Sequence, residues 1–433
     1  MKKKIFLLFF LLGGVFSFSL FAPDRLWGKN ALVSTITVSR AEEELLPAAI
    51  SWLDKIKEGQ ELLKKSVPLK YVEKNIPLYR SKKVIGYRKE IQRQEIALAV
   101  KDTVTGLIFE KRYWLETEDI KKGNAIRRYY LENEENLPRF IPLDINEDFA
   151  VTVRWWNNFN SDLSIVQTDL PPEEQDRFVV VGNKFLMENK NLAYSEDQTG
   201  QEYSDIVYTP YSEALHFSEL TIWGKSFLES NVEMAFARLK ELGVLSRAFS
   251  GQLAADAVSP QFVKNLFLIE QIDPQRIFLS EDGGLKLAER VLVRLGANQE
   301  KTFRYTFSKT GALGLGQIMP RTYASIVKAY PLAKLMKDID IGRVDIQNGI
   351  MASILTLDDH LSTVFNKMNK AARAKFEAKL STNPDFINEV RAAVYNGGPG
   401  KYRPATATIS LQVRETVDFV RKYKMVRDLK LFQ

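Results

Sequence analysis

Apolar residues recur at helical spacing through the second half of the chain. Side chains three and four positions apart share one face of a helix, so each such stripe predicts a helix with one buried side. The pattern predicts an all-helical unit over residues 206–433, in which the helices pack against one another. The stripes comprise Phe262, Leu266, Ile269 and Ile272; Leu285, Leu292 and Leu295; Ile346, Ile350, Ile354, Leu357 and Leu361; and Val413, Val417, Val420 and Tyr423.

The pattern is different before residue 206. Apolar residues alternate with other residues at Ile96, Leu98 and Val100, and again from Phe149 to Trp155, which is typical of strands. Residues 71–205 are therefore predicted to form a β-rich or α+β domain, to which the sequence assigns no role. A helical stripe through Leu46, Leu53 and Ile56 predicts a helical lead segment within residues 23–70. The expected fold class is multidomain α+β, with the helical unit at the carboxyl end.

The amino terminus has the pattern of an export signal. Lys2, Lys3 and Lys4 precede an apolar run from Ile5 to Ala22, and a basic segment followed by an apolar one is the secretory pattern. The run is long for a cleaved signal and short for a full membrane span. Residues 1–22 are thus predicted to be a signal peptide or an N-terminal anchor, and the protein is expected in the periplasm or cell envelope.

Composition excludes several kinds of chemistry. The 433 residues include no cysteine, which rules out thiol catalysis, disulfides and a lipoprotein anchor. The two histidines, His216 and His360, lie far apart in the sequence, so a multi-histidine zinc site is not expected. The net charge of +7 is spread thinly, without a dense basic run interleaved with aromatics beyond the amino terminus, and does not favour nucleic acid. We expect no metal and no cofactor.

Two glycine-containing segments carry the candidate chemistry. In the first, Glu300 precedes a loop with Gly311, Gly314 and Gly316, and Gln317 follows directly. It is not a phosphate loop, because the Lys-Ser/Thr pair is missing after the last glycine. In the second, residues 392–400, an apolar helical stretch ends in Tyr-Asn and breaks at Gly-Gly-Pro-Gly. These breakers would leave a tyrosine ring and an asparagine amide at a helix end.

Together the two segments resemble the catalytic domain of the soluble lytic transglycosylases, which has a lysozyme-like fold. The resemblance covers residues 260–425. It rests on Glu300, Phe303, Ser308, Gly311, Ala312, Gly314, Leu315, Gln317, Met319 and Pro320, and on Val394, Tyr395, Asn396, Gly398, Pro399 and Gly400.

The resemblance implies a peptidoglycan-cleaving enzyme with Glu300 as catalytic acid and base. Ser308, Gln317, Tyr395 and Asn396 are the implied substrate-binding residues. The sequence departs from the family pattern at Lys301, where the family has Ser, in a spacing to Gly311 that is one residue shorter, and at Gly296, which interrupts the expected helix. Glu270 is the competing carboxylate.

The chemistry requires a carboxylic acid that stays protonated near neutral pH, and burial against apolar groups such as Phe303 or Tyr395 would provide it. No Asp or Glu occurs between Lys301 and Gln317, so a second carboxylate is missing from this loop. The family's route needs none, because the 6-hydroxyl of N-acetylmuramic acid closes onto its own C1 and gives a 1,6-anhydro product.

Two alternatives stay open. A goose-type muramidase would hydrolyse the same bond with water held by a carboxylate such as Asp338, Asp340 or Asp345. A non-catalytic wall-binding protein would keep only the sugar groove. The expected partner is the peptidoglycan glycan strand, and a cell-envelope assembly or membrane anchoring through residues 5–22 is a further expectation.

Overall fold

The computed structural model describes residues 46–120, 141–146, 149–155, 162–166, 177–188, 203–306, 308, 310–410 and 413–432. The predicted export segment, residues 1–22, lies outside the described residues. From Ala49 to Gln433 the chain forms one compact unit. No helix among the described residues is long and apolar enough to cross a membrane.

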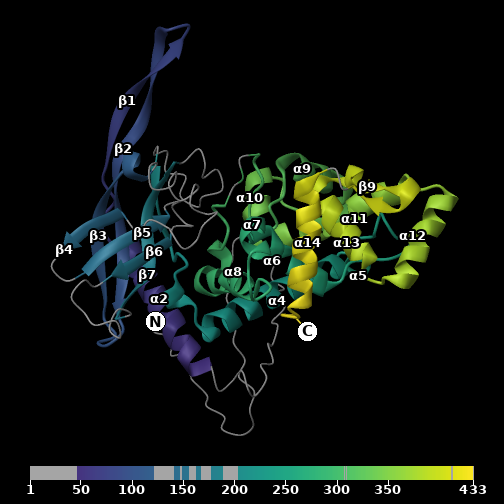
Figure 1. Ribbon diagram of the computed structural model, residues 1–433, viewed down its shortest axis with the longest axis horizontal. Helices are drawn as coiled ribbons and strands as arrows, with labels where there is room; N and C mark the ends of the chain where they lie inside the picture. Colours follow the sequence, from purple (N-terminus) through teal and green to yellow (C-terminus); the bar gives the residue numbers. More distant parts are fainter. Residues whose placement is uncertain are drawn as a thin grey trace, which may run out of the picture. The chain divides into compact units, whose positions relative to one another are not determined.

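An antiparallel sheet of five strands forms the amino-terminal part of this unit (Figure 1). Its central strand β2 is 20 residues long, so its first half pairs with β1 and its second half lies between β3 and β7. Three further strands, β4, β5 and β6, form a separate antiparallel sheet. The strands are β1 Tyr71–Arg80, β2 Lys83–Asp102, β3 Ile108–Glu116, β4 Ile141–Asn146, β5 Phe149–Trp155, β6 Asp162–Val166, β7 Phe178–Glu188 and β8 Tyr203–Tyr208.

The two faces of the five-stranded sheet are covered by different elements. Alternate residues of a strand point to opposite faces, so Ala97 and Ala99 pack with helix α2 (Leu46–Lys65), while Leu98 lies on the other face. That second face contacts Tyr305, Leu313 and Val344 of the helical region. The sheet therefore packs directly against the loop that was predicted to carry the chemistry.

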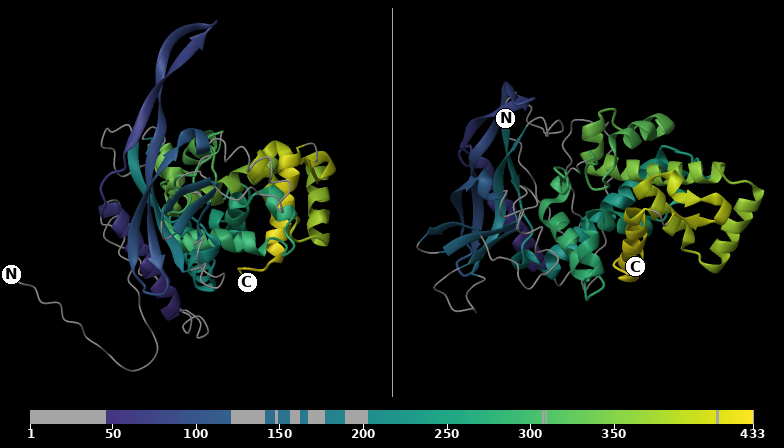
Figure 2. Two further views of the ribbon diagram at one scale, coloured as in Figure 1. Left: turned by 60° about the vertical axis from the view of Figure 1, so that its left-hand side comes forward. Right: turned by 45° about the horizontal axis from the view of Figure 1, so that its top comes forward.

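The helical region follows from residue 218 (Figure 2). Its predicted stripes coincide with α6, α8, α11 and α14, and the mixed α+β class is confirmed. The longer helices are α4 Ser218–Glu241, α6 Pro260–Gln271, α8 Leu285–Asn298, α9 Pro320–Ala329, α11 Ile346–Asn366, α12 Lys370–Thr382, α13 Phe386–Gly397 and α14 Arg414–Asp428. Short elements are α5 Ala254–Ala257, α7 Pro274–Phe278 and α10 Ile339–Val344.

Gly296 does not break its helix, although the sequence suggested that it would. Helix α8 is continuous from Leu285 to Asn298, and Gly296 lies where it crosses α4. A Cβ at Gly296 would stand 2.4 Å from the carbonyl oxygen of Leu220, and one at Gly224 would stand 1.8 Å from that of Leu292. The two glycines thus permit a close helix crossing.

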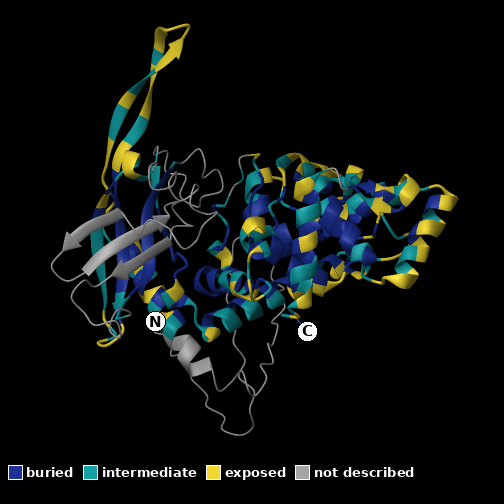
Figure 3. Cartoon of the chain, viewed as in Figure 1, coloured by how far each residue is buried: buried dark blue, intermediate teal, exposed yellow. Residues whose placement is uncertain are grey.

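Helix α11 is the centre of the helical core. Most of its 21 residues are buried; its isoleucines, Leu355 and Leu357 join the largest hydrophobic cluster among the described residues, and Leu361 joins a second one. Figure 3 shows this buried helix within a shell of half-buried and exposed helices. The helices that surround α11, including α6, α9 and α13, hold the segments described below.

Candidate functional site

The glycine-rich loop, residues 311–318, has a defined conformation. Leu313 and Ile318 form an isolated antiparallel bridge, and Gly311 and Gly314 take the left-handed φ values of +92° and +73° that favour glycine. Arg343, which is buried, donates from Nη1 to the carbonyl oxygens of Gly311, at 2.6 Å, and Ile318, at 3.0 Å. One guanidinium therefore ties the two ends of the loop together.

The far side of the loop lies against the end of α6. Gln271 donates from Nε2 to the carbonyl oxygen of Leu315 at 2.9 Å and to that of Gly314 at 3.3 Å. Gly316 is wedged so tightly that a Cβ would stand 2.3 Å from Ser353 Oγ and 3.0 Å from Tyr395 Oη. Three helices, α6, α11 and α13, thus converge on the loop.

Tyr395 provides the contact from α13. Its hydroxyl donates to the carbonyl oxygen of Gly316 at 2.6 Å and also lies 3.1 Å from Ser353 Oγ. Burial raises the pKa of the Tyr395 hydroxyl well above its usual range, and the negative charge of Glu270 adds to the effect. Tyr395 is therefore a neutral hydrogen-bond donor that lies within electrostatic reach of Glu270.

Glu270 has the surroundings that a catalytic acid needs. It occupies the last turn of α6, next to Gln271, and is half-buried. Burial raises the pKa of the Glu270 carboxyl to about 8; the nearby ammonium of Lys422 lowers it and the carboxylate of Glu415 raises it further. The dominant cause is desolvation, which disfavours the charged form of a carboxyl group.

Lys422 holds the carboxyl end of α6, the helix that carries Glu270, in place. It is a buried residue of α14, and its Nζ donates to the carbonyl oxygens of Ile269 and, at 2.8 Å, Ile272. A cation at a helix C-terminus satisfies the last carbonyls and complements the negative end of the helix dipole. Burial lowers the pKa of the Lys422 ammonium, while Glu270 opposes the shift.

Glu300 lies in different surroundings, and these do not meet the requirement of burial. It sits in a short 3-10 turn, Gln299–Lys301, directly after α8, and its side chain is exposed. The adjacent Asn298 is buried and bonds to the backbone of Thr209, donating to its oxygen at 2.9 Å and accepting from its nitrogen at 2.8 Å. This helix end is tied to the chain following β8 rather than to the glycine-rich loop.

The other predicted binding residues have bonds within the protein. Ser308 Oγ accepts from the backbone nitrogen of Ala312 at 2.9 Å and so closes the turn that leads into the loop. Gln317, at a φ of +46°, donates from Nε2 to the carbonyl oxygen of Gly314 at 2.7 Å. Asn396 Oδ1 accepts from Thr416 Oγ1 at 3.2 Å, which joins α13 to α14.

The structure thus brings Gln317 and Tyr395 to one loop and places Asn396 beside Tyr395 in the sequence. Ser308 lies at the other end of the loop, and Glu300 belongs to another helix end. Phe303, a candidate apolar neighbour for the acid, packs under the guanidinium of Arg294 at 4.4 Å.

The three aspartates weighed as water-positioning residues serve as structural residues. Asp338 is the N-cap of α10, Asp345 is the N-cap of α11, and Asp340 pairs with Arg343 at 2.5 Å. The carboxylate within electrostatic reach of Glu270 is instead Glu415, an exposed residue in the first turn of α14. Sequence reasoning missed Glu415 because it lies 145 positions after Glu270 (415 − 270), in a helix whose closeness to α6 only the fold establishes.

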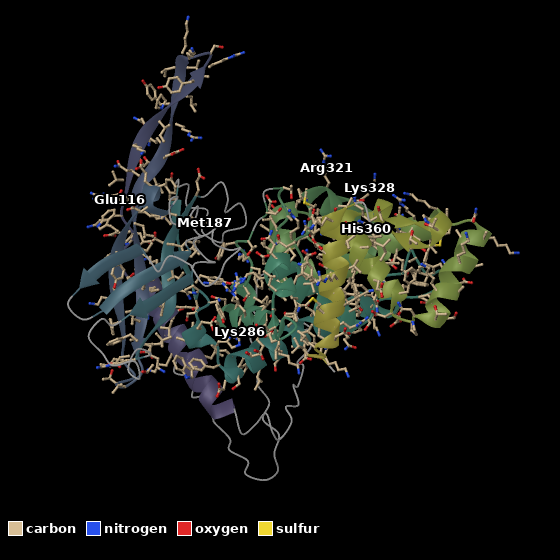
Figure 4. The ribbon with its side chains drawn as sticks, viewed as in Figure 1. Glu116, Met187, Lys286, Arg321, Lys328 and His360 are labelled. Carbon is tan, nitrogen blue, oxygen red and sulfur yellow. The ribbon has the colours of Figure 1, made fainter. Side chains whose placement is uncertain are left out.

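Neither histidine belongs to this cluster. His360, labelled in Figure 4, bonds through Nδ1 to the carbonyl oxygen of Val394 at 2.8 Å, and burial lowers its pKa. His216 bonds to Tyr211 at 2.8 Å and to Glu289 at 3.0 Å. Within the described part of the chain, no group of three or more His, Asp and Glu side chains is placed to hold a metal ion.

The cluster can therefore present one carboxyl group with a raised pKa near a glycine-rich loop that hydrogen bonds from Arg343, Gln271 and Tyr395 hold in place. No family model, curated protein or solved structure matches the chain.

Proposed function

We propose that the protein is an exported peptidoglycan lytic transglycosylase whose helical region has a lysozyme-like architecture. The proposal keeps the reaction implied by the sequence motifs but moves the catalytic acid from Glu300 to Glu270. The substrate is the glycan strand, cut at the β-1,4 bond between N-acetylmuramic acid and N-acetylglucosamine. Export rests on the basic and apolar pattern of residues 1–22.

The observation that carries the proposal is the position of Glu270. Its pKa is raised by burial, and it lies within electrostatic reach of Tyr395, which bonds directly to the glycine-rich loop. A carboxyl group of this kind remains protonated near neutral pH and can donate a proton to a poor leaving group. Exposed Glu300 has no such environment.

In the first step, Glu270 protonates the glycosidic oxygen while the C1–O bond breaks. The acetamido oxygen of N-acetylmuramic acid bonds to C1 and compensates the positive charge that develops there. Glu270 is then ionised, and it removes the proton from the 6-hydroxyl of the same sugar. The O6 atom bonds to C1 as the acetamido oxygen leaves, so the product is a 1,6-anhydro sugar and no water is consumed.

The neighbouring residues have positioning roles in this scheme. Tyr395 and Gln271 hold the backbone of residues 314–316 beside the end of α6, and Arg343 closes the loop from the other side. Lys422 fixes the last turn of α6, which carries Glu270. Gln317 lies in the same loop, and its amide can exchange the bond to Gly314 for one to the sugar.

A muramidase is the second candidate, and Glu415 is the observation that favours it. Hydrolysis needs a carboxylate that positions and activates water opposite the acid. Glu415 is exposed and lies within electrostatic reach of Glu270, whereas the three aspartates expected from the sequence act as helix caps or an ion-pair partner. The two candidates share the acid and differ in the nucleophile.

The product distinguishes them. Purified peptidoglycan is digested with the protein, and the released muropeptides are measured by mass spectrometry and by borohydride labelling of reducing ends. The transglycosylase gives products lighter by one water that resist borohydride. Reducing ends that disappear in Glu415→Gln would instead indicate the muramidase. A protein that binds the wall polymer but releases no muropeptide would contradict both.

A further inference from the structure

The outer part of the β1–β2 hairpin, residues 74–89, forms an arm that pairs only with itself among the described residues. Strand β3 meets β2 from Arg93 onward and β7 meets it from Ala97 onward, so the arm extends beyond both (Figures 1 and 2). Its turn, at Ser81 and Lys82, has φ values of +48° and +66°, the left-handed pair typical of a tight hairpin turn. The arm is thus an ordered hairpin with both faces open.

Large apolar side chains are exposed along this arm. The exposed fractions are 65% for Tyr79, 67% for Tyr87 and 62% for Ile85, with Leu78 and Val84 also exposed. Figure 3 shows the outer hairpin coloured as exposed, with half-buried stretches between. Single exposed apolar residues are ordinary on a soluble protein, but a cluster of them marks a binding surface.

The strand register places Tyr79, Val84 and Tyr87 on one face of the arm and Leu78 on the other, while Ile85 lies at the register shift, outside the paired ladder. Directly paired residues of an antiparallel ladder share a face, and successive residues alternate. Tyr79 pairs with Val84 and Pro77 pairs with Tyr87, which gives one apolar, aromatic face. The opposite face has the pairs Arg80–Lys83, Leu78–Gly86 and Ile76–Arg88, so it carries three cations beside two aliphatic side chains, and Arg88 is ion-paired with Glu90.

The arm is strongly basic. Between Lys74 and Lys89 there is no Asp or Glu, and the segment contains six cations: Lys74, Arg80, Lys82, Lys83, Arg88 and Lys89. The inner cations have acidic partners outside the arm, since Lys74 pairs with Glu118 and Lys89 with Glu73. Arg88 pairs with Glu90, and among the described residues Arg80, Lys82 and Lys83 at the tip form no ion pair, so their charge is uncompensated there.

The sequence analysis found no dense basic run with aromatics beyond the amino terminus, but residues 79–89 contain five cations and two tyrosines, so that interpretation does not hold for the arm. Hairpin pairing gathers them at one end of the molecule. Figure 4 shows the side chains of the outer hairpin projecting away from the rest of the sheet.

We propose that this arm docks on the surface of an anionic lipid bilayer. Tyrosine with aliphatic neighbours is suited to the boundary between headgroups and acyl chains, where an apolar ring body and a polar hydroxyl are both satisfied. Lysine and arginine on the other face attract anionic headgroups, each contributing most within a Debye length of the surface. The two faces together match both chemical layers of a membrane interface.

Other occupants match only one of the two faces. A duplex nucleic acid would pair with the cations through its phosphates but leave Tyr79, Val84 and Tyr87 in water, because its base faces are already stacked on one another. A second copy pairing edge to edge would bring two basic hairpins together, and the register shift between Leu78 and Tyr79 disrupts the regular edge that such pairing needs.

The test uses the absence of cysteine in the chain. In the full-length protein, Ser81→Cys creates one labelling site at the tip of the arm for an environment-sensitive fluorophore. Vesicles of phosphatidylglycerol and phosphatidylcholine are compared with vesicles of phosphatidylcholine alone. The label should shift to the blue and brighten on the anionic vesicles, and the response should weaken as salt is raised. A label at Ser381→Cys, on an exposed position of α12, should not respond.

The apolar residues 5–22 can tether the protein to either kind of vesicle, but a label at position 81 reports on the arm itself. Reversing the tip charges with Arg80→Glu, Lys82→Glu and Lys83→Glu should lower the affinity for anionic vesicles, measured from the lipid concentration that gives half of the label response, by at least about 100-fold. Each cation contributes on the order of tenfold or slightly less to this affinity. The control makes the same change in net charge at Lys367, Lys370 and Lys375, which are exposed in and before α12, and should leave the response intact.

Several results would overturn the proposal. They are a label response that is equal on neutral and anionic vesicles, no response on either, and an equal loss in the α12 control. A response without lipid that grows with protein concentration would assign the arm to a second copy of the chain, and a response to nucleic acid but not to vesicles would assign it to a polyanion.

Discussion

Helices α6 and α8 both end next to a glutamate, and the two ends are built in opposite ways. The end of α6 is enclosed: Gln271 bonds to the glycine-rich loop, Lys422 caps its last carbonyls, and Glu270 is half-buried. The end of α8 is anchored by Asn298 to the backbone of Thr209, and Glu300 points into solvent. The short sequence spacing to the glycine-rich loop favours Glu300 as the catalytic acid, whereas burial of the side chain favours Glu270.

The contrast shows what makes a carboxyl group useful as an acid. A glutamate in water is ionised at neutral pH, and only desolvation or a neighbouring negative charge keeps the proton on it. Both causes act on Glu270, with burial the larger. A short sequence motif records the residue type and the spacing but not the burial that determines the pKa.

The largest expected effect separates the two glutamates directly. Glu270→Gln preserves the volume and removes the acid, so release of muropeptides should fall by about 10²–10⁴-fold, the usual contribution of general acid–base catalysis. Glu300→Gln changes an exposed side chain and should keep activity within about twofold, since surface substitutions alter little. Initial rates on purified peptidoglycan measure both.

Circular dichroism and thermal unfolding provide the control, because both variants should fold as the wild type does. Activity lost in Glu300→Gln and kept in Glu270→Gln would return the acid to the exposed helix end. It would also show that the position of Glu270 near Tyr395 and the glycine-rich loop does not determine which glutamate is the acid.

The next effect concerns the tight packing of Gly316 against α11 and α13. Gly316→Ala places a methyl group where 2.3 Å separates it from Ser353 Oγ, so the loop or α11 must move. Overpacking of this kind costs about 1–3 kcal/mol of stability, and a displaced loop should lower activity by roughly 10–100-fold. Gly400→Ala is the matched control, because a Cβ there meets nothing within 4 Å. Equal activity in both variants would show that the loop position is not critical.

A smaller effect is expected at the tyrosine that joins α13 to the loop. Tyr395→Phe removes the hydroxyl that donates to the carbonyl oxygen of Gly316, and one such bond contributes about 1 kcal/mol, so activity should fall by about 5–10-fold. Tyr402→Phe is the matched control: its hydroxyl is buried without a hydrogen-bond partner among the described residues, and its removal should cost nothing. A greater loss in Tyr402→Phe would contradict the assignment.

The sequence predicted the helices well because their burial is periodic. The stripe from Ile346 to Leu361 became the buried centre of the helical core, and alternation around Leu98 became the central strand β2. Gly311 and Gly314 were also singled out, and their left-handed φ values give a local reason for glycine at these positions, whereas Tyr395 was singled out by the family resemblance and bonds to a loop 79 positions away. Local patterns suffice where the cause is local.

The acid itself could not be located in this way. Helix α8 is inserted between Glu270 and the loop, so the carboxyl group near the loop in space is about 40 residues before it in sequence. Lys422 and Glu415, which act on its pKa, come from the last helix of the chain. Gly296 was misread for the same reason, because its role depends on Gly224 of α4, 72 positions before it (296 − 224). Tertiary packing determines all of these.

The smallest expected effect is a change in pH dependence. If Glu270 is the acid, activity is present while it is protonated and falls as pH rises through its raised pKa. The positive charge of Lys422 lowers that pKa, so Lys422→Met should raise it and move the alkaline limb of the pH–activity profile to higher pH. The same change removes two bonds to the end of α6, so peak activity should also fall by a few-fold.

Lys424→Met is the control on the same helix, because its ammonium pairs with Glu389 at 2.9 Å instead of capping α6. The limb should stay in place in that variant. A limb that does not move in Lys422→Met, in a protein that Glu270→Gln inactivates, would mean that the alkaline limb reports another group and that the charge of Lys422 does not tune the acid.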